Sequence, residues 1–400
     1  MTQARFKSAV ILLTGVAPWA IIWCGSQVLA QPPAPGTAEG FEATEYFQPE
    51  NTRLKYRIAG AEAQLQSGGR YLIKQLKIET FRVTGGREVV VEAPECLYDS
   101  AKGQASSPGH LQVQSGDGRL SVAGEGFLWQ QSQGNLTISN QVRSIIQRAE
   151  TNTATAPPLV ITSRWFSFET TNCSAVFHDD VRGNDPEMEF TCGGLAIHAG
   201  SGGQSLEGRS FEVVEADQSL VITGKADGRH ATADRGIYLR SDERVELIGN
   251  VNWQQGRQSG RADRAVVHRL EKDALADGRV AMKLPRESLG AGGTLLAGTN
   301  TPVRAGHELP LVELYADQFH SRSNLTVAAG AVRLVDGTNR LSCDKLTVQS
   351  ASASAPDETA TAEGNVVLEQ SDGNLHAARA VYTKSDAKIV FTGEPKWTQA

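Results

Sequence analysis

Residues 244–253 of the chain read RVELIGNVNW, and this stretch decides the fold. Its apolar side chains recur at every second position, at Val245, Leu247, Val251 and Trp253, and most of the positions between them are polar. Successive side chains of a strand point to opposite faces of a sheet, so a period of two indicates a strand with one apolar face. The stretch therefore predicts a half-buried β-strand.

The same alternation recurs along most of the chain. It is seen near the C-terminus at Ile389 and Phe391, and in short runs at 76–83, 89–93, 111–113, 120–123, 136–138, 221–223 and 325–328. Residues that favour turns, such as glycine and asparagine, separate the runs. The best helical pattern is Asn140 to Glu150, which is also compatible with a strand and a turn. We predict an all-β protein of antiparallel meanders.

Composition excludes two classes of protein. The chain has 400 residues, 39 basic and 45 acidic side chains and a formal net charge of -6, which gives no basic field for a nucleic acid. The only long uncharged apolar run is N-terminal, which excludes a protein that crosses a membrane many times. The length predicts about two or three domains.

The N-terminus carries the features of an export signal. Arg5 and Lys7 precede the apolar run 9–24, and Ala30 offers a small residue for cleavage. Residues 1–30 are therefore a cleaved signal peptide or an anchor in the inner membrane, and the run itself fits both. Residues 31–40 (QPPAPGTAEG) form a linker. We expect the folded part to be exported to the periplasm.

No pattern of catalytic or metal-binding residues stands out. Cys96, Cys173, Cys192 and Cys343 fit no zinc spacing, although disulfides of undetermined pairing could form in an oxidising compartment. The eight histidines form no metal motif, and no nucleophile elbow, phosphate loop or dinucleotide motif occurs. We expect no enzyme activity, cofactor or metal, and a polysaccharide-acting enzyme has no support.

Internal repeats organise the strands. The pattern from Val181 to Ile197 matches the pattern from Val332 to Val348 in register, and both contain a Val-Arg pair and a cysteine. The Gly249-Asn250-Val251 segment likewise matches Gly364-Asn365-Val366. Because the offsets differ, the repeating unit is a hairpin with variable insertions. The insertions have loop compositions and lie near 285–310 and 350–359.

These phrases resemble a known family. Ala231 to Tyr238, Leu247-Ile248-Gly249-Asn250-Val251 and Ala262 to Val266 are similar to the OstA-like repeats of periplasmic lipopolysaccharide transport proteins, the LptA-LptC superfamily. Residues 378–395 follow the same cadence. The resemblance implies an incomplete β-jellyroll, a β-taco, in two modules: an LptC-like module at 41–155 and an OstA/LptA-like module at 160–400.

The resemblance also implies a function. The chain would be a non-enzymatic, periplasmic lipid-binding protein of the lipopolysaccharide transport (Lpt) bridge, carrying lipopolysaccharide or a related amphiphile in a hydrophobic groove toward the outer membrane. Other Lpt-type jellyroll proteins would join it by edge-strand addition, and the inner membrane would hold it through 9–24 if that run is an anchor. The alternative is a structural or adhesive envelope protein with closed cores and no lipid.

Two sets of residues are candidates for the lipid site. The candidates for an acyl-lined interior are Val245, Leu247, Val251, Trp253, Val366, Leu368, Ile389 and Phe391. For each of them the alternative is the core of a closed sandwich. Arg257, Arg261 and Arg264 lie in a locally basic stretch and are candidates for contacts with lipid phosphates. Their alternative is a solvated strand face.

Overall fold

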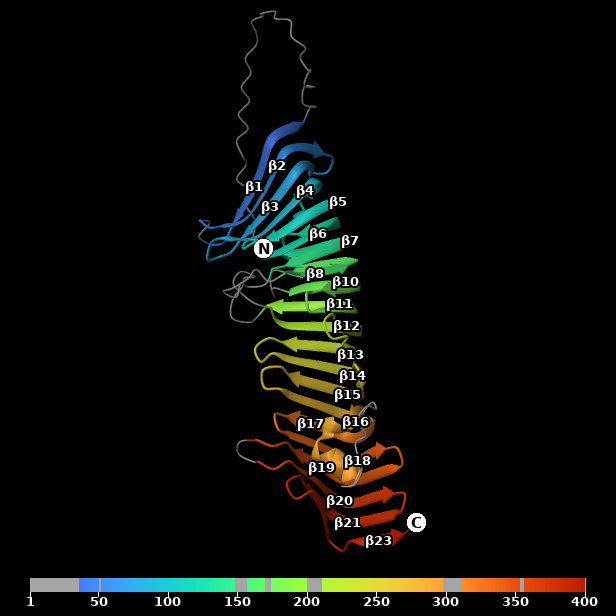
Figure 1. Cartoon of the computed structure of the whole chain (residues 1–400). Helices are drawn as coiled ribbons and strands as arrows, with labels where there is room; N and C mark the ends of the chain where they lie inside the picture. The colour runs from blue at the N-terminus through green and yellow to red at the C-terminus, as the bar shows by residue number, and fades with distance from the viewer. Residues whose placement is uncertain are drawn as a thin grey trace, which may run out of the picture.

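One continuous antiparallel sheet makes up almost the whole structure. The computed structural model describes residues 36–49, 52–147, 157–169, 174–199, 211–297, 311–352 and 356–399. Its 23 strands form a single elongated sheet, with β1 at one end and β22 and β23 at the other (Figure 1). The expected all-β, antiparallel class is confirmed.

The strand bounds follow in chain order. They are β1 (Thr37–Tyr46), β2 (Leu54–Gln66), β3 (Arg70–Phe81), β4 (Arg87–Asp99), β5 (Gln104–Ser115), β6 (Leu120–Gln130), β7 (Asn135–Ile146), β8 (Leu159–Ser163), β9 (Trp165–Glu169), β10 (Ser174–Asn184), β11 (Met188–Ala199), β12 (Phe211–Gly224), β13 (His230–Leu239), β14 (Arg244–Gln255), β15 (Gln258–His268), β16 (Asp273–Pro285), β17 (Leu311–Arg322), β18 (Leu325–Asp336), β19 (Asn339–Gln349), β20 (Thr359–Gln370), β21 (Gly373–Thr383), β22 (Lys388–Thr392) and β23 (Lys396–Gln399). A 3-10 helix, η1 (Arg286–Leu289), and an α-helix, α1 (Ala291–Ala297), follow β16.

Each long strand pairs with the strands before and after it in the chain. The short strands β8 and β9 both lie between β7 and β10, so the sheet continues without a break through residues 159–169. Short hairpin connections favour this meander, because neighbours in the chain then become neighbours in the sheet.

Mid-strand bulges recur in every second strand. Two consecutive residues with positive φ interrupt β10, β12, β14, β16, β18 and β20, and the pairing register shifts at the same places. In β14 these residues are Gly249 (φ 77) and Asn250 (φ 47). A Cβ at Gly249 would overlap the Asp234 carboxylate of β13, while Asn250 Nδ2 donates a hydrogen bond to Asp234 Oδ2 at 2.9 Å. Bulges bend a strand and increase its twist.

The internal repeats of the sequence are repeats of this hairpin geometry. Asn365 Nδ2 donates to Asp344 Oδ2 at 3.0 Å beside Gly364, as Asn250 does to Asp234. In the other repeat, Val181 pairs with Cys192 in β10 and β11, and Val332 pairs with Cys343 in β18 and β19. The repeated glycine-asparagine pair therefore marks the mid-strand bulges of β14 and β20.

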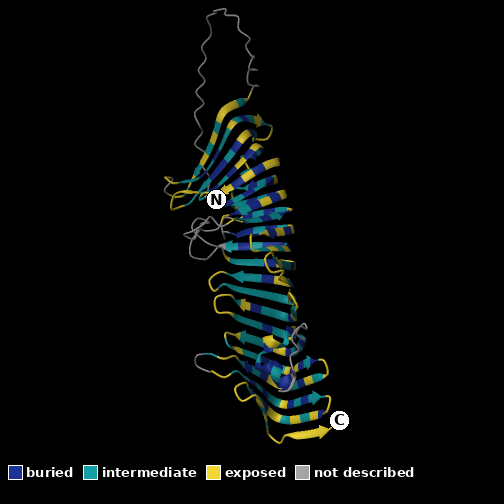
Figure 2. Cartoon of the chain, in the orientation of Figure 1, coloured by how far each residue is buried: buried dark blue, intermediate teal, exposed yellow. Residues whose placement is uncertain are grey.

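Two hydrophobic clusters hold the sheet together. The N-terminal cluster runs from Tyr56 to Leu220 and the C-terminal cluster from Ala262 to Tyr382. We call β13, β14 and β15 the waist, where the two clusters meet; β15 contributes Ala262 to the C-terminal cluster. In β14 only Val251 is buried, and most other waist residues are half-buried, as the teal strands in the middle of Figure 2 show. The face that carries both clusters is called the inner face.

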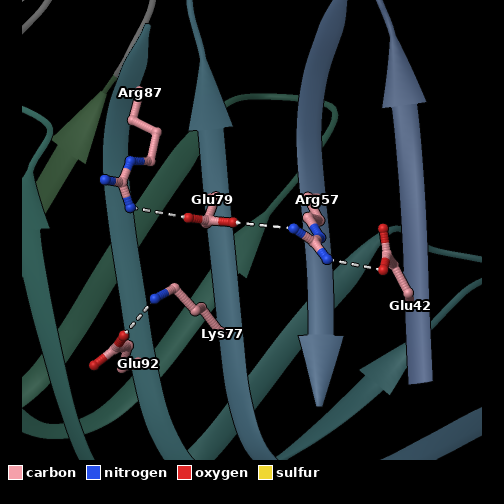
Figure 3. A network of polar contacts seen from close by, with 6 residues as sticks. All are labelled: Glu42, Arg57, Lys77, Glu79, Arg87 and Glu92. Atoms are coloured by element: carbon pink, nitrogen blue, oxygen red, sulfur yellow. Dashed lines mark hydrogen bonds and ion pairs between the residues drawn. The ribbon is translucent and has the colours of Figure 1, made fainter. Parts of the chain in front are cut away.

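The opposite, outer face is polar. At the N-terminal end of the sheet, Arg57 of β2 pairs with Glu42 of β1 at 2.9 Å and with Glu79 of β3 at 3.9 Å, and Glu79 also pairs with Arg87 of β4 at 3.2 Å (Figure 3). Opposite charges therefore alternate across four neighbouring strands. Such cross-strand pairs stabilise an exposed sheet face modestly.

The structure corrects the helical pattern at Asn140 to Glu150. Residues 140–146 belong to β7, and the remainder lies largely outside the described residues. The buried positions are Val142, Ser144 and Ile146, which have a period of two. The apolar spacing of Val142, Ile145 and Ile146 suggested a helix because Ser144, a polar residue, occupies a buried position of the strand.

The insertion after β16 also differs from its loop composition. Residues 286–297 form η1 and α1, and residues 298–310 lie outside the described part of the chain. In the second predicted insertion, residues 353–355 are likewise outside it.

Candidate functional site

All eight apolar candidates belong to three strands, β14, β20 and β22. In β14, Val251 is buried at 1% exposure, while Val245, Leu247 and Trp253 are half-buried. Leu247 packs against the N-terminal cluster and Trp253 against the C-terminal cluster. The β14 candidates therefore lie at the waist and touch both clusters.

The other four candidates lie within the C-terminal cluster. Val366 and Leu368 of β20 are buried at 1% and 4% exposure. Ile389 and Phe391 of β22 are half-buried and pack against that cluster. Opposite residues of an antiparallel pair share a face, and Phe391 pairs with the buried Ala380. The structure thus brings the eight candidates to one side of the sheet, in two groups.

Trp253 covers a gap in the neighbouring strand. It pairs with Gly260 of β15, where a Cβ would overlap the indole ring. The ring therefore occupies the space over a position without a side chain. This arrangement widens the apolar surface at the waist, where few other side chains are fully buried.

A gap in the N-terminal cluster is small. The apolar gap among Val89, Val113, Leu120, Val122, Phe166 and Phe168 in the N-terminal cluster has a volume of only 10 Å³. That space holds about one water molecule. At the waist, by contrast, Val245, Leu247 and Trp253 remain half-buried and leave apolar surface partly open to solvent.

The three arginine candidates do not converge on one point. Arg257 lies in the turn between β14 and β15, Arg261 is exposed on β15, and Arg264 lies beyond the register shift of the same strand. Arg264 Nε donates to Glu246 Oε1 at 2.7 Å, and Arg264 also lies 3.7 Å from Asp277. The hydrogen bond to Glu246 raises the pKa of the Arg264 guanidinium. Its charge is balanced locally.

The polar hollow on the outer face involves different residues. It is lined in part by His178, Glu215, Asp217 and Arg235, from β10, β12 and β13. Arg235 forms an ion pair with Glu215 there. Across the described ranges, no three metal-ligating side chains come together. The hollow therefore combines a salt-bridged polar part with aliphatic side chains, among them Val176 and Leu195.

The cysteines of the described chain are buried thiols. Cys96, Cys192 and Cys343 are free, and Cys173 lies outside the described residues. Burial raises the pKa of each of these three thiols to about 12. A thiolate is the reactive form, so these side chains act as small apolar core residues.

Sequence reasoning missed two parts of the inner face. One is the aromatic centre of the N-terminal cluster, where Phe166 and Phe177 have ring centroids 5.0 Å apart. The alternation of Phe166 and Phe168 in β9 could have revealed it. The other is α1, whose Leu295 and Leu296 are fully buried against the C-terminal cluster. Its sequence, AGGTLLA, carries no helical signal that sets it apart from a loop.

Comparison with known proteins finds a family match in the C-terminal part of the chain. Residues 313–400 match the family described as LptA/(LptD N-terminal domain) LPS transport protein. Among solved structures, this chain is similar to that of LptH, the LptA homologous periplasmic component of the conserved lipopolysaccharide transport device from Pseudomonas aeruginosa. The identity is 16%, the TM-score is 0.28, and the match covers 31% of this chain and 93% of that chain. No curated protein sequence matches the chain.

The fold and the inner face define an all-β protein with a long apolar sheet surface. The residues that match the LptA/LptD N-terminal family, 313–400, comprise β18 to β23 and most of β17. The resemblance to the OstA-like superfamily of lipopolysaccharide transport proteins is thereby confirmed for this part of the chain.

Proposed function

We propose that the chain is a non-enzymatic, periplasmic lipid-binding protein of the lipopolysaccharide transport bridge. It would carry lipopolysaccharide or a related amphiphile along its inner face toward the outer membrane. One observation carries the proposal: a single sheet presents buried apolar residues on one face from Tyr56 in β2 to Tyr382 in β21. Such a face offers acyl chains an apolar path along the sheet.

Burial of acyl chains supplies the binding free energy. Each methylene group removed from water contributes about 0.8 kcal/mol, so a few contacts at the waist hold a chain without any polar recognition. Val245, Leu247 and Trp253 are the half-buried residues best placed to make them. Val251, Val366, Leu368, Ile389 and Phe391 would extend the same surface into packed regions.

The arginines would contact the phosphate groups of the lipid. Arg257 and Arg261 are both exposed, but Arg261 pairs with Asn252 and therefore lies on the outer face, while Arg264 is engaged by Glu246. A guanidinium binds phosphate with two parallel hydrogen bonds. We retain all three as proposed contacts with lipid phosphates.

The two ends of the sheet would bind partner modules. Within the described residues β1 pairs with β2 alone, and β22 and β23 pair with β21 alone. Their outer edges present backbone groups for strand addition. The β1 edge carries Glu39, Glu42 and Glu45, whereas the other edge carries Lys388 and Lys396. Partner edges of opposite charge would fit each end.

The domain division and the membrane link also belong to this proposal. We keep modules at 41–155 and 160–400, with the sheet continuous between them. In the part of the chain that the structure describes, no helix is long and apolar enough to cross a membrane. The run 9–24, a cleaved signal or an inner-membrane anchor, lies outside that part.

Mass spectrometry of bound lipid tests the proposal. The chain lacking residues 1–30 would be purified from an envelope fraction beside Trp253→Glu, Val251→Glu and Val390→Glu. Val390 is 55% exposed and so serves as the control. We expect stoichiometric amphiphile in the parent and in Val390→Glu, and its loss from folded Trp253→Glu, because a carboxylate on the inner face opposes apolar burial.

The alternative is a structural or adhesive envelope protein, and the burial of the apolar residues in the two clusters favours it. Lipid-free parent protein that also fails to take up added lipopolysaccharide would establish this alternative and contradict the proposal.

A further inference from the structure

The helix α1 occupies the inner face of the C-terminal half. It packs against β18, β19, β20 and β21, with Leu295 and Leu296 fully buried. Figure 1 shows α1 lying against these strands, and Figure 2 shows it coloured as buried. Leu289 of η1 is buried in the same cluster at 4% exposure. The helix therefore covers apolar surface that strands alone would leave open.

Two polar contacts hold the first half of this segment. The Ala291 N–H donates to Glu358 Oε1 at 2.6 Å, and Glu358 Oε2 accepts from Lys384 Nζ at 2.7 Å. Arg286 forms an ion pair with Asp336 at the end of β18, and the Asp336 side chain is only 8% exposed. These contacts fasten the segment to β18 and to the start of β20.

The helix is weak by itself. It has seven residues, AGGTLLA, and isolated helices below about 12 residues are unstable in water. Each of its two glycines makes the helix less favourable than alanine by about 1 kcal/mol. Its structure therefore depends on packing against the sheet and on the two polar contacts, which makes it separable from the sheet.

We propose that residues 286–297 are an internal competitor of the acyl chain at the inner face of β18–β21. This inference rests on the proposed function, because the leucines of α1 occupy the apolar surface that the lipid would use. Lipid would bind there only after the helix leaves. The apparent affinity is then lower than the intrinsic affinity by the fraction of molecules with the helix displaced.

A disulfide that locks the helix in place tests the competition. A Cβ at Gly292 would lie 3.0 Å from Val348 Cγ2, which suits a disulfide between Gly292→Cys and Val348→Cys. Binding of radiolabelled purified lipopolysaccharide to the full chain would be measured with the double variant oxidised and reduced. The two single variants control for the native cysteines. We expect oxidation to weaken binding by about tenfold or more.

The possible results separate the inference from the proposed function. Equal binding by oxidised and reduced protein overturns the inference and leaves the proposed function intact. Absence of binding in the reduced and the parent protein overturns the proposed function and the inference with it. Loss of binding on oxidation alone supports both.

A second pair of variants opens the helix instead of locking it. Glu358→Ala removes the acceptor of the Ala291 N–H, and we expect lipopolysaccharide to bind about fivefold to tenfold more tightly. Glu363→Ala is the matched control, because Glu363 lies in β20, directly after Glu358 in the chain order of charged residues, and pairs with Arg379 at 3.5 Å. Unchanged affinity in folded Glu358→Ala, or an equal gain in Glu363→Ala, would contradict the competition.

Discussion

Gly249 shows how a single residue shapes the sheet. Its φ of 77 lies in the left-handed region, and a Cβ there would overlap Asp234. Gly256, in the next turn, also has positive φ, at 56, but a Cβ there would meet nothing within 4 Å. A substitution at Gly256 would meet backbone strain alone, whereas a substitution at Gly249 would meet backbone strain and a steric conflict. Comparing the two positions therefore separates the two effects.

The corresponding prediction compares two substitutions. We expect Gly256→Ala to lower the free energy of unfolding by about 1 kcal/mol, from the left-handed backbone alone. Gly249→Ala should cost about 2 kcal/mol or more, because Asp234 must also move. Urea unfolding of both variants measures the difference. Equal losses would show that the contact with Asp234 does not constrain the bulge.

Buried thiols predict how stability depends on pH. Burial raises the pKa of Cys343 from 9.0 to about 12, so the native state keeps a proton that the unfolded state releases between those values. The stabilising contribution is complete below about pH 9 and decreases as pH rises toward 12. Cys343→Ala should make the fall in the free energy of unfolding less steep, by up to about 1.4 kcal/mol per pH unit.

Chemical denaturation at pH 8.5 to about 10.5 measures this slope in parent and variant. Comparing the two slopes removes the contribution of the lysines and tyrosines that both proteins share. Parallel slopes would mean that the Cys343 thiol titrates normally in the folded chain.

At the scale of the element, α1 is the clearest case in which packing overrides composition. The helix is predicted to contribute stability through its leucines. Leu296→Ala, at a fully buried position, should lower the free energy of unfolding by about 3 kcal/mol. Leu270→Ala, at 74% exposure in a turn, should change it by less than about 0.5 kcal/mol. A similar small change in both variants, measured by urea unfolding, would mean that α1 is detached in solution.

The elements differ in how well their sequences predict them. The strand at 244–253 was predictable because its alternation is regular on both sides of the bulge. The strand β7 was ambiguous because Ser144 places a hydroxyl on the inner face. The helix α1 was not predictable, because its helical state depends on contacts with β18–β21, which are distant in sequence. Local patterns do not encode such contacts.

The same limit applies to the candidate site. Alternation placed Val251 and Phe391 on the inner face, and the structure agrees with that placement. The sequence did not predict how deeply each of these side chains is buried, because burial depends on packing between strands that are distant in the sequence. Likewise, the basic count near Arg264 gave no sign that Glu246 and Asp277 balance its charge.

At the scale of the whole molecule, two buried clusters are joined by a waist of mostly half-buried residues. We therefore predict that each cluster can be destabilised without the other. Contacts in a repeat sheet are mostly between neighbours, so destabilisation should stay local. Leu334→Ala, in the C-terminal cluster, should speed amide hydrogen exchange in β16–β21 and leave β2–β7 unchanged. Ile73→Ala, in the N-terminal cluster, should do the reverse. Both side chains are fully buried. Faster exchange along the entire sheet in either variant would indicate one cooperative unit.

Site-specific photo-crosslinking tests the central claim most directly. A benzoylphenylalanine side chain would replace Trp253 or Phe391 on the inner face, and Asn252 or Val390, their outward-facing neighbours, as controls. The protein would be irradiated in cells whose lipopolysaccharide is radiolabelled. The account predicts lipopolysaccharide adducts at Trp253 and Phe391 and none at Asn252 or Val390. Adducts at neither inner position, or equal adducts on both faces, would contradict it.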